Sequence, residues 1–462
     1  MLTESAATYI AIAYCLLLPA LYRKPLWIAA TYIIFRAAFQ IFASKGYMFL
    51  GLVPWFTPIA LTTIAVIAFN LYLNPVRTKL PVPFVLYGIF SMFVIAVELI
   101  KFESWDDLLE LVISLSVPAA LYLCVFGGIK RVSDVDKALK LFLLAMIVPA
   151  AAGLYQFFIA GGGYSIAIDD FIPDFRITGS IIDPNLYGIF LCMMLFAVIA
   201  LLMRGERSAP YLMAFAAVAG LIVLAQNRGS WIAVAAALAI AVAVFHRHLN
   251  IARWIAGALA LAVVATPIVI ARFENLNEVD QYGQSQDTLS SRLDMQTMLL
   301  EESASQPFFG LGYGQSVNLI HQSTGISMPP HNDFIRVISE AGYFNFLLYL
   351  CFILSIAISP RSVRRGDSWK MRFALVGFGS YVVIISTAQN LLYDLLIYPA
   401  MMYLIAVAHK SFSPRQARGK VWMRQGAIPN GPVSVRSPAM PTGGGGDSAF
   451  GGTPREALQD TQ

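Results

Sequence analysis

Charged side chains are scarce in this chain. Only 13% of its 462 residues are Asp, Glu, Lys or Arg, whereas 58% are hydrophobic and the mean hydropathy is +0.67. A soluble protein of this length needs more surface charge, so the composition excludes the soluble classes. Runs of about 20 mostly apolar residues, the length that crosses a bilayer, recur up to about residue 409. The sequence therefore predicts an all-α, polytopic integral membrane protein.

Cysteine is also rare, and no CxxC pair occurs. All four cysteines fall inside predicted apolar spans: Cys15, Cys124, Cys192 and Cys351. Disulfide frameworks and zinc sites need cysteines that can meet, so neither is predicted. The acidic residues Asp169, Asp170 and Asp174 lack an obvious metal-site arrangement and can equally belong to a solvated loop. We place no metal site and no cofactor; metal dependence stays open.

Thirteen apolar spans are predicted, within a range of about 12 to 14. Only Gln389, Asn390 and Asp394 interrupt the last long stretch, so one bent helix with a re-entrant piece is the alternative there. A long loop, 272–333, joins the tenth and eleventh spans. The spans are 6–22, 26–43, 52–73, 83–100, 108–128, 138–159, 184–203, 209–226, 230–246, 254–271, 334–358, 371–388 and 391–409.

Positive charges concentrate in alternate connections, such as 23–24, 130–140 and 361–372. Basic loops remain in the cytoplasm, so the other set of connections, which includes the long loop, is predicted to be periplasmic. The first span has no positive charge before it and is expected to remain as a helix, not to be cleaved as a signal peptide. The predicted periplasmic set holds only Lys45, Lys101, Arg176, Arg228, Arg272 and Arg292.

The C-terminal segment 411–462 differs from the rest because it is rich in proline and glycine. This composition predicts a disordered cytoplasmic tail that follows a transmembrane domain of residues 1–410. The net charge of +5 comes mostly from the orientation signal and this tail. Nucleic acid is therefore not expected as a partner.

Each of three polar segments on the predicted periplasmic side contains an arginine. Arg176 precedes the Asp-Pro-Asn turn at 183–185, which opens the next helix, and Arg228 lies at a glycine-containing turn between two helices. Arg292 is expected in the first turn of an amphipathic helix that begins near residue 290. An isolated interfacial arginine can also snorkel to lipid phosphates, and this alternative stays open for Arg228.

The long loop ends in PPHNDFIRVISEAGYF, with His331 where the next helix begins. An imidazole titrates near neutrality, so His331 can accept a proton from an attacking hydroxyl. A plain role at the helix start is the alternative. Arg336 and Glu340 follow at i, i+4 spacing, which predicts a structural ion pair.

Four segments in order resemble the bacterial O-antigen ligase and O-antigen polymerase superfamily of membrane glycosyltransferases. They are FRITGSIIDPNLYG, QNRGSW, SRLDMQTMLLEESASQPFFGLGYG and PPHNDFIRVISEAGYF, and the resemblance covers about residues 140–410. It implies transfer of a glycan from an undecaprenyl-diphosphate-linked donor to a sugar hydroxyl, on the periplasmic face of the bacterial inner membrane. The implied partners are this donor, a glycan or lipid-core acceptor, membrane lipids and other polysaccharide export proteins.

The resemblance also assigns roles to residues. His331 would be the general base, and Arg228 and Arg176 would act with it in catalysis. Arginines of this kind bind a diphosphate through bidentate, charge-assisted hydrogen bonds of about 1.5–3 kcal/mol each. The expected substrate-binding residues are Arg292, Asn332, Asn185 and Arg336.

Several functions stay open. The superfamily contains polymerases, which extend lipid-linked repeat units, and ligases, which pass the polysaccharide to lipid A-core. Nothing in the chain marks a lipid-core site, so polymerisation of O-antigen or exopolysaccharide is our first prediction. A solute transporter, a lipid-linked glycan flippase and a secretion adaptor are the alternatives. Arg36, inside the second span, has no identifiable partner in the sequence, although an arginine there costs about 2.5–3.5 kcal/mol.

Overall fold

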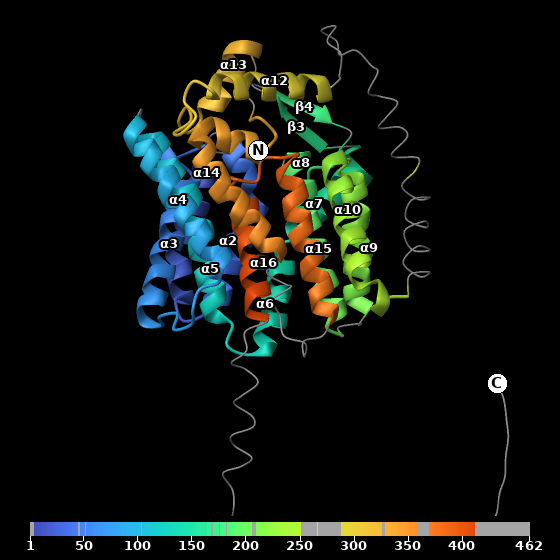
Figure 1. Ribbon diagram of the computed structural model, residues 1–462. Helices are drawn as coiled ribbons and strands as arrows, with labels where there is room; N and C mark the ends of the chain where they lie inside the picture. Colours follow the sequence, from blue (N-terminus) through green and yellow to red (C-terminus); the bar gives the residue numbers. More distant parts are fainter. Residues whose placement is uncertain are drawn as a thin grey trace, which may run out of the picture. The chain divides into compact units, whose positions relative to one another are not determined.

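The fold is a bundle of helices with two short hairpins (Figure 1). The computed structural model describes residues 4–44, 47–50, 52–102, 104–161, 163–167, 170–174, 176–181, 183–205, 209–250, 266, 288–325, 329–358 and 369–411. The longer helices are α1 (Glu4–Leu17), α2 (Pro25–Ser44), α3 (Phe56–Leu73), α4 (Val82–Lys101), α5 (Trp105–Gly128), α6 (Val132–Leu144), α7 (Ile147–Tyr155), α8 (Pro184–Met203), α9 (Ala209–Leu224), α10 (Arg228–Phe245), α12 (Thr288–Ser303), α13 (Gln315–Thr324), α14 (Asp333–Ile358), α15 (Trp369–Ser386) and α16 (Ile397–Ser411). The antiparallel hairpins are β1 (Met48–Phe49) with β2 (Val53–Pro54), and β3 (Gly163–Ala167) with β4 (Asp170–Asp174).

In the described part of the chain, nine helices are long and apolar enough to cross a membrane. Three more predicted spans coincide with α2, which is kinked at Phe39, and with α9 and α16, which have 16 and 15 residues. The predicted span 254–271 lies outside the described residues, as do the tail from residue 412 and Arg272. The predicted all-α, polytopic membrane fold is confirmed.

Some predicted boundaries are wrong. The span 138–159 begins earlier than predicted, at Val132, and a turn at 145–146 divides it into α6 and α7. The amphipathic helix begins at Thr288, so Arg292 lies in its second turn. The last span is helical only from Ile397, and an irregular stretch, 387–396, precedes it.

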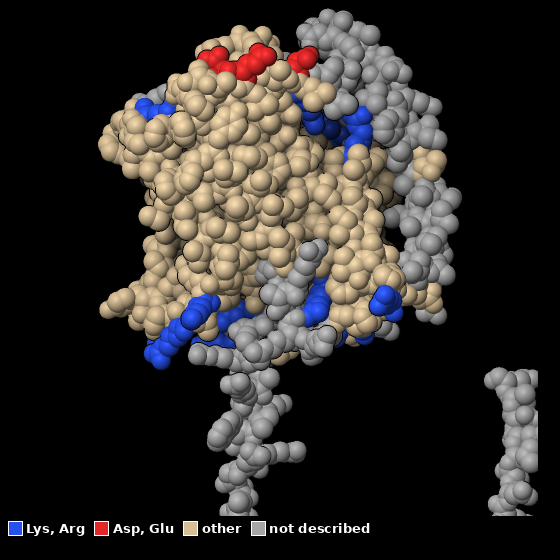
Figure 2. All heavy atoms as spheres, viewed as in Figure 1, with Lys and Arg blue, Asp and Glu red and all other residues tan. Residues whose placement is uncertain are grey.

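The two ends of the bundle differ in their connections. Helices α12 and α13 and the hairpin β3–β4 lie at one end, which we call the capped end (Figure 1). The opposite end, which we call the basic end, carries lysine and arginine side chains (Figure 2). Arg204 forms an ion pair there with Asp136. This distribution follows the alternation of charge along the sequence.

Helix α8 is enclosed by its neighbours over almost its whole length. It packs against α6, α9, α10, α15 and α16. Nearly every side chain from Pro184 to Leu201 is buried, on all sides of the helix. A helix that is apolar all round has no solvent-facing stripe and belongs in the interior of a bundle. The start of α8 therefore lies at the centre of the capped end.

Helix α14 is broken near its outer end. Gly342 has φ 84° and ψ 170°, which ends the first helical piece. The break leaves carbonyls without helical partners: the carbonyl of Ser339 accepts a hydrogen bond from Leu311 N (2.6 Å), and that of Glu340 accepts one from Gly312 N (3.0 Å). The segment 307–314 is thereby docked onto the break.

Glycine is required on both sides of this contact. A Cβ on Gly342 would collide with the backbone carbonyl of Phe308, and a Cβ on Gly310 would collide with the backbone around Ala341. Both glycines also have positive φ. The first piece of α14, which begins at Asp333, is therefore a separate short helix held by the segment 307–314.

The stretch 387–396, which we call the connector, is mostly buried although it is not helical. The carboxylate of Asp333 accepts hydrogen bonds from Leu391 N (2.9 Å) and Leu392 N (3.0 Å). Tyr32 of α2 donates a hydrogen bond to the carbonyl of Leu395 (2.9 Å). Non-helical backbone at membrane depth needs such partners inside the protein. The connector therefore links α2 to the first turn of α14.

Candidate functional site

His331 lies just before α14, in a left-handed backbone conformation (φ 53°) that few residues other than glycine adopt. Its Nδ1 atom is buried and has no hydrogen-bond partner in the described part of the chain. Burial, and then the nearby positive charge of Arg292, lower the pKa of His331 to about 4. The imidazole is therefore neutral at physiological pH, and one ring nitrogen is unused.

The two residues after His331 fix the start of α14. The side-chain oxygen of Asn332 accepts hydrogen bonds from Phe334 N (3.0 Å) and Ile335 N (3.2 Å), which caps the helix. Asp333 is fully buried and receives a hydrogen bond from the hydroxyl of Tyr349 (3.1 Å), besides the two from the connector. The strained backbone of His331 is thus held by a cap and by an anchored carboxylate.

Arg228 is the first residue of α10. The side chain of the preceding residue, Asn227, accepts a hydrogen bond from Ser230 N (3.1 Å) and donates one to the carbonyl of Asn185 (2.9 Å). This brings the start of α10 against the start of α8, where a Cβ on Gly188 would meet Asn227. The predicted site residues Asn185 and Arg228 therefore lie at one junction of two helix N-termini.

Arg292 lies on α12 with its side chain partly buried. Burial, and then the positive charge of Arg228, lower the pKa of Arg292. Arg228 acts on Arg292 and Arg292 acts on His331, so the fold brings these three predicted residues together. Basic side chains gather between α12 and the near end of α10, whereas the outward side of α12 is acidic (Figure 2). Like charges held together in this way favour an anionic ligand.

Arg176 belongs to the segment 176–181, which crosses the capped end before α8. Two backbone N–H groups of this segment, from Thr178 and Gly179, donate to the side-chain oxygen of Gln156 (2.8 Å each). The charge of Arg176 acts on Asp183, which caps α8; burial raises the pKa of Asp183 and Arg176 partly offsets this. Arg176 therefore lies beside the start of α8.

Arg336 and Glu340 form a buried ion pair, with 3.1 Å between Arg336 Nε and Glu340 Oε1. Ser316 donates a hydrogen bond to the same carboxylate (2.5 Å), and the guanidinium lies over the ring of Tyr393, 4.7 Å from its centroid. We call these four residues, Arg336, Glu340, Ser316 and Tyr393, the paired cluster. They belong to α13, α14 and the connector. The charges of this cluster are satisfied within the protein.

Sequence reasoning did not identify several residues at this end. Asp333 follows the His-Asn pair, and its position at a helix entry is a signal that could have suggested an anchor. Tyr393 has φ 73°, and Gln226 before α10 has φ 51°, so strained residues flank the site on two further sides. No sequence pattern marks them, because the connector is irregular and its partners are distant in the chain.

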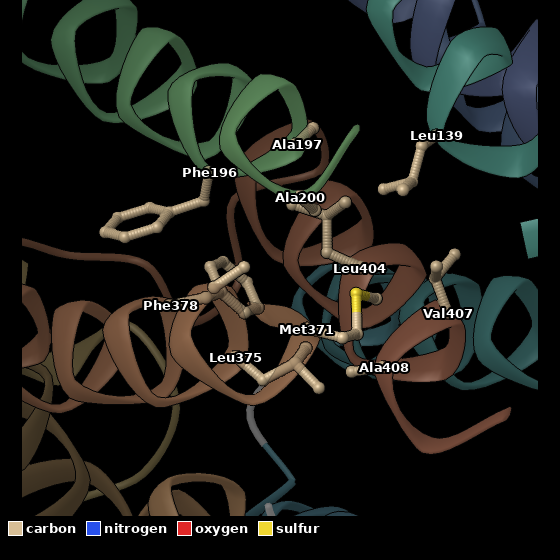
Figure 3. Close-up of a pocket in the computed structure, with 11 residues that line it drawn as sticks. Leu139, Phe196, Ala197, Ala200, Met371, Leu375, Phe378, Leu404, Val407 and Ala408 are labelled. Carbon is tan, nitrogen blue, oxygen red and sulfur yellow. The ribbon is translucent and has the colours of Figure 1, made fainter. Parts of the chain in front are cut away.

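The bundle also contains a small apolar cavity, away from the capped end. A cavity of about 20 Å³ lies between α6, α8, α15 and α16, and all of its lining side chains are apolar (Figure 3). Met371 and Val407 place it towards the basic end. It has no polar group that could hold water or perform chemistry. In the described residues no group of three or more His, Cys, Asp or Glu side chains could hold a metal ion.

Comparison with known families agrees with the geometry. Residues 212–350 match the family described as O-antigen ligase. The match includes Arg228, Arg292, His331 and Arg336, whereas Arg176 and Asn185 precede it. No curated protein matches the chain. The matched family supports glycan transfer of the O-antigen ligase type in general. Residues 212–350 are thus similar to the O-antigen ligase family, which belongs to the superfamily that the four sequence segments resemble.

Proposed function

We propose that this protein transfers a glycan from an undecaprenyl-diphosphate-linked donor to a sugar hydroxyl at the capped end. The observation that carries the proposal is the neutral, partly buried imidazole of His331, with an unused nitrogen and a guanidinium nearby. Such a group can accept a proton in a place where an anion is attracted. Polymerisation of O-antigen or exopolysaccharide repeat units is the first candidate reaction.

The arginines would bind the diphosphate of the donor. Arg228 and Arg292 repel each other in the free protein, and a diphosphate between them would turn this repulsion into attraction. Arg176 would contribute from the start of α8. Guanidinium groups held in place before the reaction also stabilise the negative charge that develops on the leaving oxygen.

His331 would act on the acceptor. The acceptor hydroxyl oxygen attacks the anomeric carbon, the bond from that carbon to the diphosphate oxygen breaks, and the lipid diphosphate leaves with the electron pair. The hydroxyl proton passes to the imidazole. A bound diphosphate would also raise the pKa of His331 from its low value in the free protein, which makes the imidazole a stronger base when the donor is present.

We further propose that the capped end faces the periplasm of a bacterial inner membrane and that the C-terminus is cytoplasmic. The support is the distribution of basic residues, since Lys and Arg concentrate in the connections at the basic end. A polyprenyl carrier can then reach the arginines from the outer leaflet.

The experiment is a genetic complementation with glycan profiling by gel and mass spectrometry. The gene is deleted and replaced by wild type or by His331→Ala. Accumulation of single lipid-linked repeat units, in both the deletion and the variant, supports polymerisation; long lipid-linked chains that fail to reach lipid A-core support ligation. We expect His331→Ala to lose about 10²- to 10⁴-fold in turnover. An unchanged glycan profile would contradict the proposal and favour a transporter or flippase.

The variant must also fold. His331→Ala should unfold at the same temperature as wild type, because Asn332 and Asp333, not His331, fasten the start of α14. A purified variant that is folded and still fully active would remove His331 from the role of base.

A further inference from the structure

Arg36 is buried in the N-terminal half of the bundle, outside the matched O-antigen ligase domain. Its side chain is on α2, the residue is 2% exposed, and the guanidinium carbon lies 5.8 Å from the ring centroid of Trp55 and 5.7 Å from that of Phe56. Its Nε and Nη1 atoms have no hydrogen-bond partner in the described part of the chain. A charge in such a position needs compensation through space or from a ligand.

The connector supplies a carboxylate close to this charge. Tyr32 lies one helical turn before Arg36, on the same side of α2, and donates its hydroxyl to the carbonyl of Leu395. The adjacent residue, Asp394, caps α16 by accepting hydrogen bonds from Leu396 N (2.8 Å) and Ile397 N (2.6 Å). Burial disfavours the ionised carboxylate of Asp394, and its two backbone hydrogen bonds and the nearby guanidinium of Arg36 favour it.

The same face of α2 also meets the segment before α8. The hydroxyl of Ser180 donates a hydrogen bond to the carbonyl of Ala37 (2.5 Å), one residue after Arg36. The carboxylate of Asp183 lies near enough to Asp394 for the two negative charges to repel each other. Arg36 therefore lies at the part of α2 that contacts both the connector and the segment 176–181.

From Asp394 the connector reaches the candidate site in a few residues. Leu391 and Leu392 are hydrogen-bonded to Asp333, two residues after His331. Nearer its start, the side-chain amide of Gln389 packs against Gly229, the residue after Arg228. A shift of the connector would therefore also move the start of α14 and the start of α10.

We propose that Arg36 is a positioning residue, which holds the connector through the charge of Asp394 and thereby sets the relative positions of His331 and Arg228. The catalytic part of this inference rests on the proposed function, whereas the effect on the geometry of His331 does not. In this role Arg36 acts through the connector and not on the reacting groups. It adds a residue of α2 to a site whose other members come from later elements.

The test is a double-mutant cycle with Arg36→Gln, Asp394→Asn and the double variant. Asparagine keeps the cap of α16 and removes only the charge. Each single variant leaves one buried charge uncompensated, so we expect the kcat of glycan transfer to fall about 10- to 100-fold, with the KM for the lipid-linked donor unchanged. The double variant should recover most of this loss. Arg36→Lys, which keeps the charge, should recover more than Arg36→Gln.

A second measurement does not depend on transfer. The imidazole ¹⁵N signals of His331 should move in Arg36→Gln and return towards wild type in the double variant. Unchanged His331 signals would overturn the inference even if transfer is lost, and a wild-type protein without transfer would overturn only the proposed function. A raised donor KM without recovery in the double variant would also overturn it, because Arg36 would then contact the donor directly. Arg247→Gln, at the exposed basic end, is the matched control and should change neither measurement.

Discussion

Two clusters at the capped end contain buried or partly buried arginine, and they differ in how the charge is balanced. In the paired cluster, Arg336 meets the carboxylate of Glu340 and the ring of Tyr393. Around Arg292, the neighbouring groups are a second guanidinium and a neutral imidazole. In the paired cluster, the positive charge of Arg336 is balanced by the negative charge of Glu340. Under the proposed function, the second cluster binds the diphosphate of the donor.

We propose that this difference distinguishes structural from functional arginines better than their spacing in the sequence does. Removing one partner of a buried ion pair is costly, because the other charge is left buried without compensation. A cation placed beside other cations lowers the stability of the free protein and is expected at a site that binds a negative group. The predictions below test each half of this contrast.

The largest effect is expected from Glu340→Gln. This change removes the carboxylate but keeps an acceptor for Ser316, so Arg336 is left as a buried, unpaired charge. We expect a loss of about 3–5 kcal/mol in the free energy of unfolding. Thermal unfolding in nanodiscs measures it. Glu301→Gln, at an exposed position on α12, is the control. An equal loss of stability in both variants would contradict a structural role of the Arg336–Glu340 pair.

Arg228→Lys tests the other cluster. An ammonium keeps the charge but cannot form a bidentate fork with a diphosphate, so kcat/KM should fall about 10- to 100-fold while the unfolding temperature stays the same. Transfer to a defined acceptor in proteoliposomes is the measurement. The control is Arg247→Lys at the basic end. Unchanged activity of Arg228→Lys would mean that Arg228 only reaches lipid phosphates.

Gly342→Ala tests the break in α14. Alanine disfavours the backbone conformation of Gly342, and its Cβ would push against the carbonyl of Phe308. We expect a loss of about 1–3 kcal/mol in stability and release of the segment 307–314 from α14, which faster hydrogen exchange at Leu311 would report. Gly220→Ala, where a Cβ meets nothing within 4 Å, should not lower the stability. Slow exchange at Leu311 in Gly342→Ala would contradict this account of the break.

The smallest effect is a change in titration. Imidazolium at His331 is disfavoured by burial and by Arg292, so protonation occurs only as the pH falls through about 4. Arg292→Gln removes one of these two causes, and the pKa of His331 should therefore rise, by about 0.5 to 1 unit. NMR titration of the imidazole measures it. A pKa that stays in place or falls would separate Arg292 from His331.

The sequence predicts the membrane spans well because an apolar run of sufficient length has few alternatives to a helix in lipid. It also predicts that α8 begins at Pro184 and that the charges alternate between the two ends. It does not predict the break at Gly342 or the connector, because both depend on contacts between distant segments, such as that of Asp333 with Leu391. Nor does it predict a partner for Arg36, since Asp394 is more than three hundred residues away.

Within the site, the sequence identifies residue types but not their grouping. Arg228, Arg292 and His331 follow from local motifs, and the fold then brings them together through α10, α12 and the start of α14. Asn332 is different, because its side-chain oxygen is used as a helix cap. A polar residue at a helix start is expected to cap, and only coordinates show whether its atoms are already used.

The enclosure of α8 has a consequence for biogenesis. Two of the helices that cover it, α15 and α16, follow it in the chain and are synthesised later, and α16 also packs against α5, which precedes α8. Until these helices arrive, α8 faces lipid, which its uniformly apolar surface tolerates. Insertion and assembly are therefore separate events in this protein. A nascent chain that stops at α14 would already cross the membrane many times, yet it would lack the connector that anchors Asp333 and would reach the quality-control machinery as an open bundle.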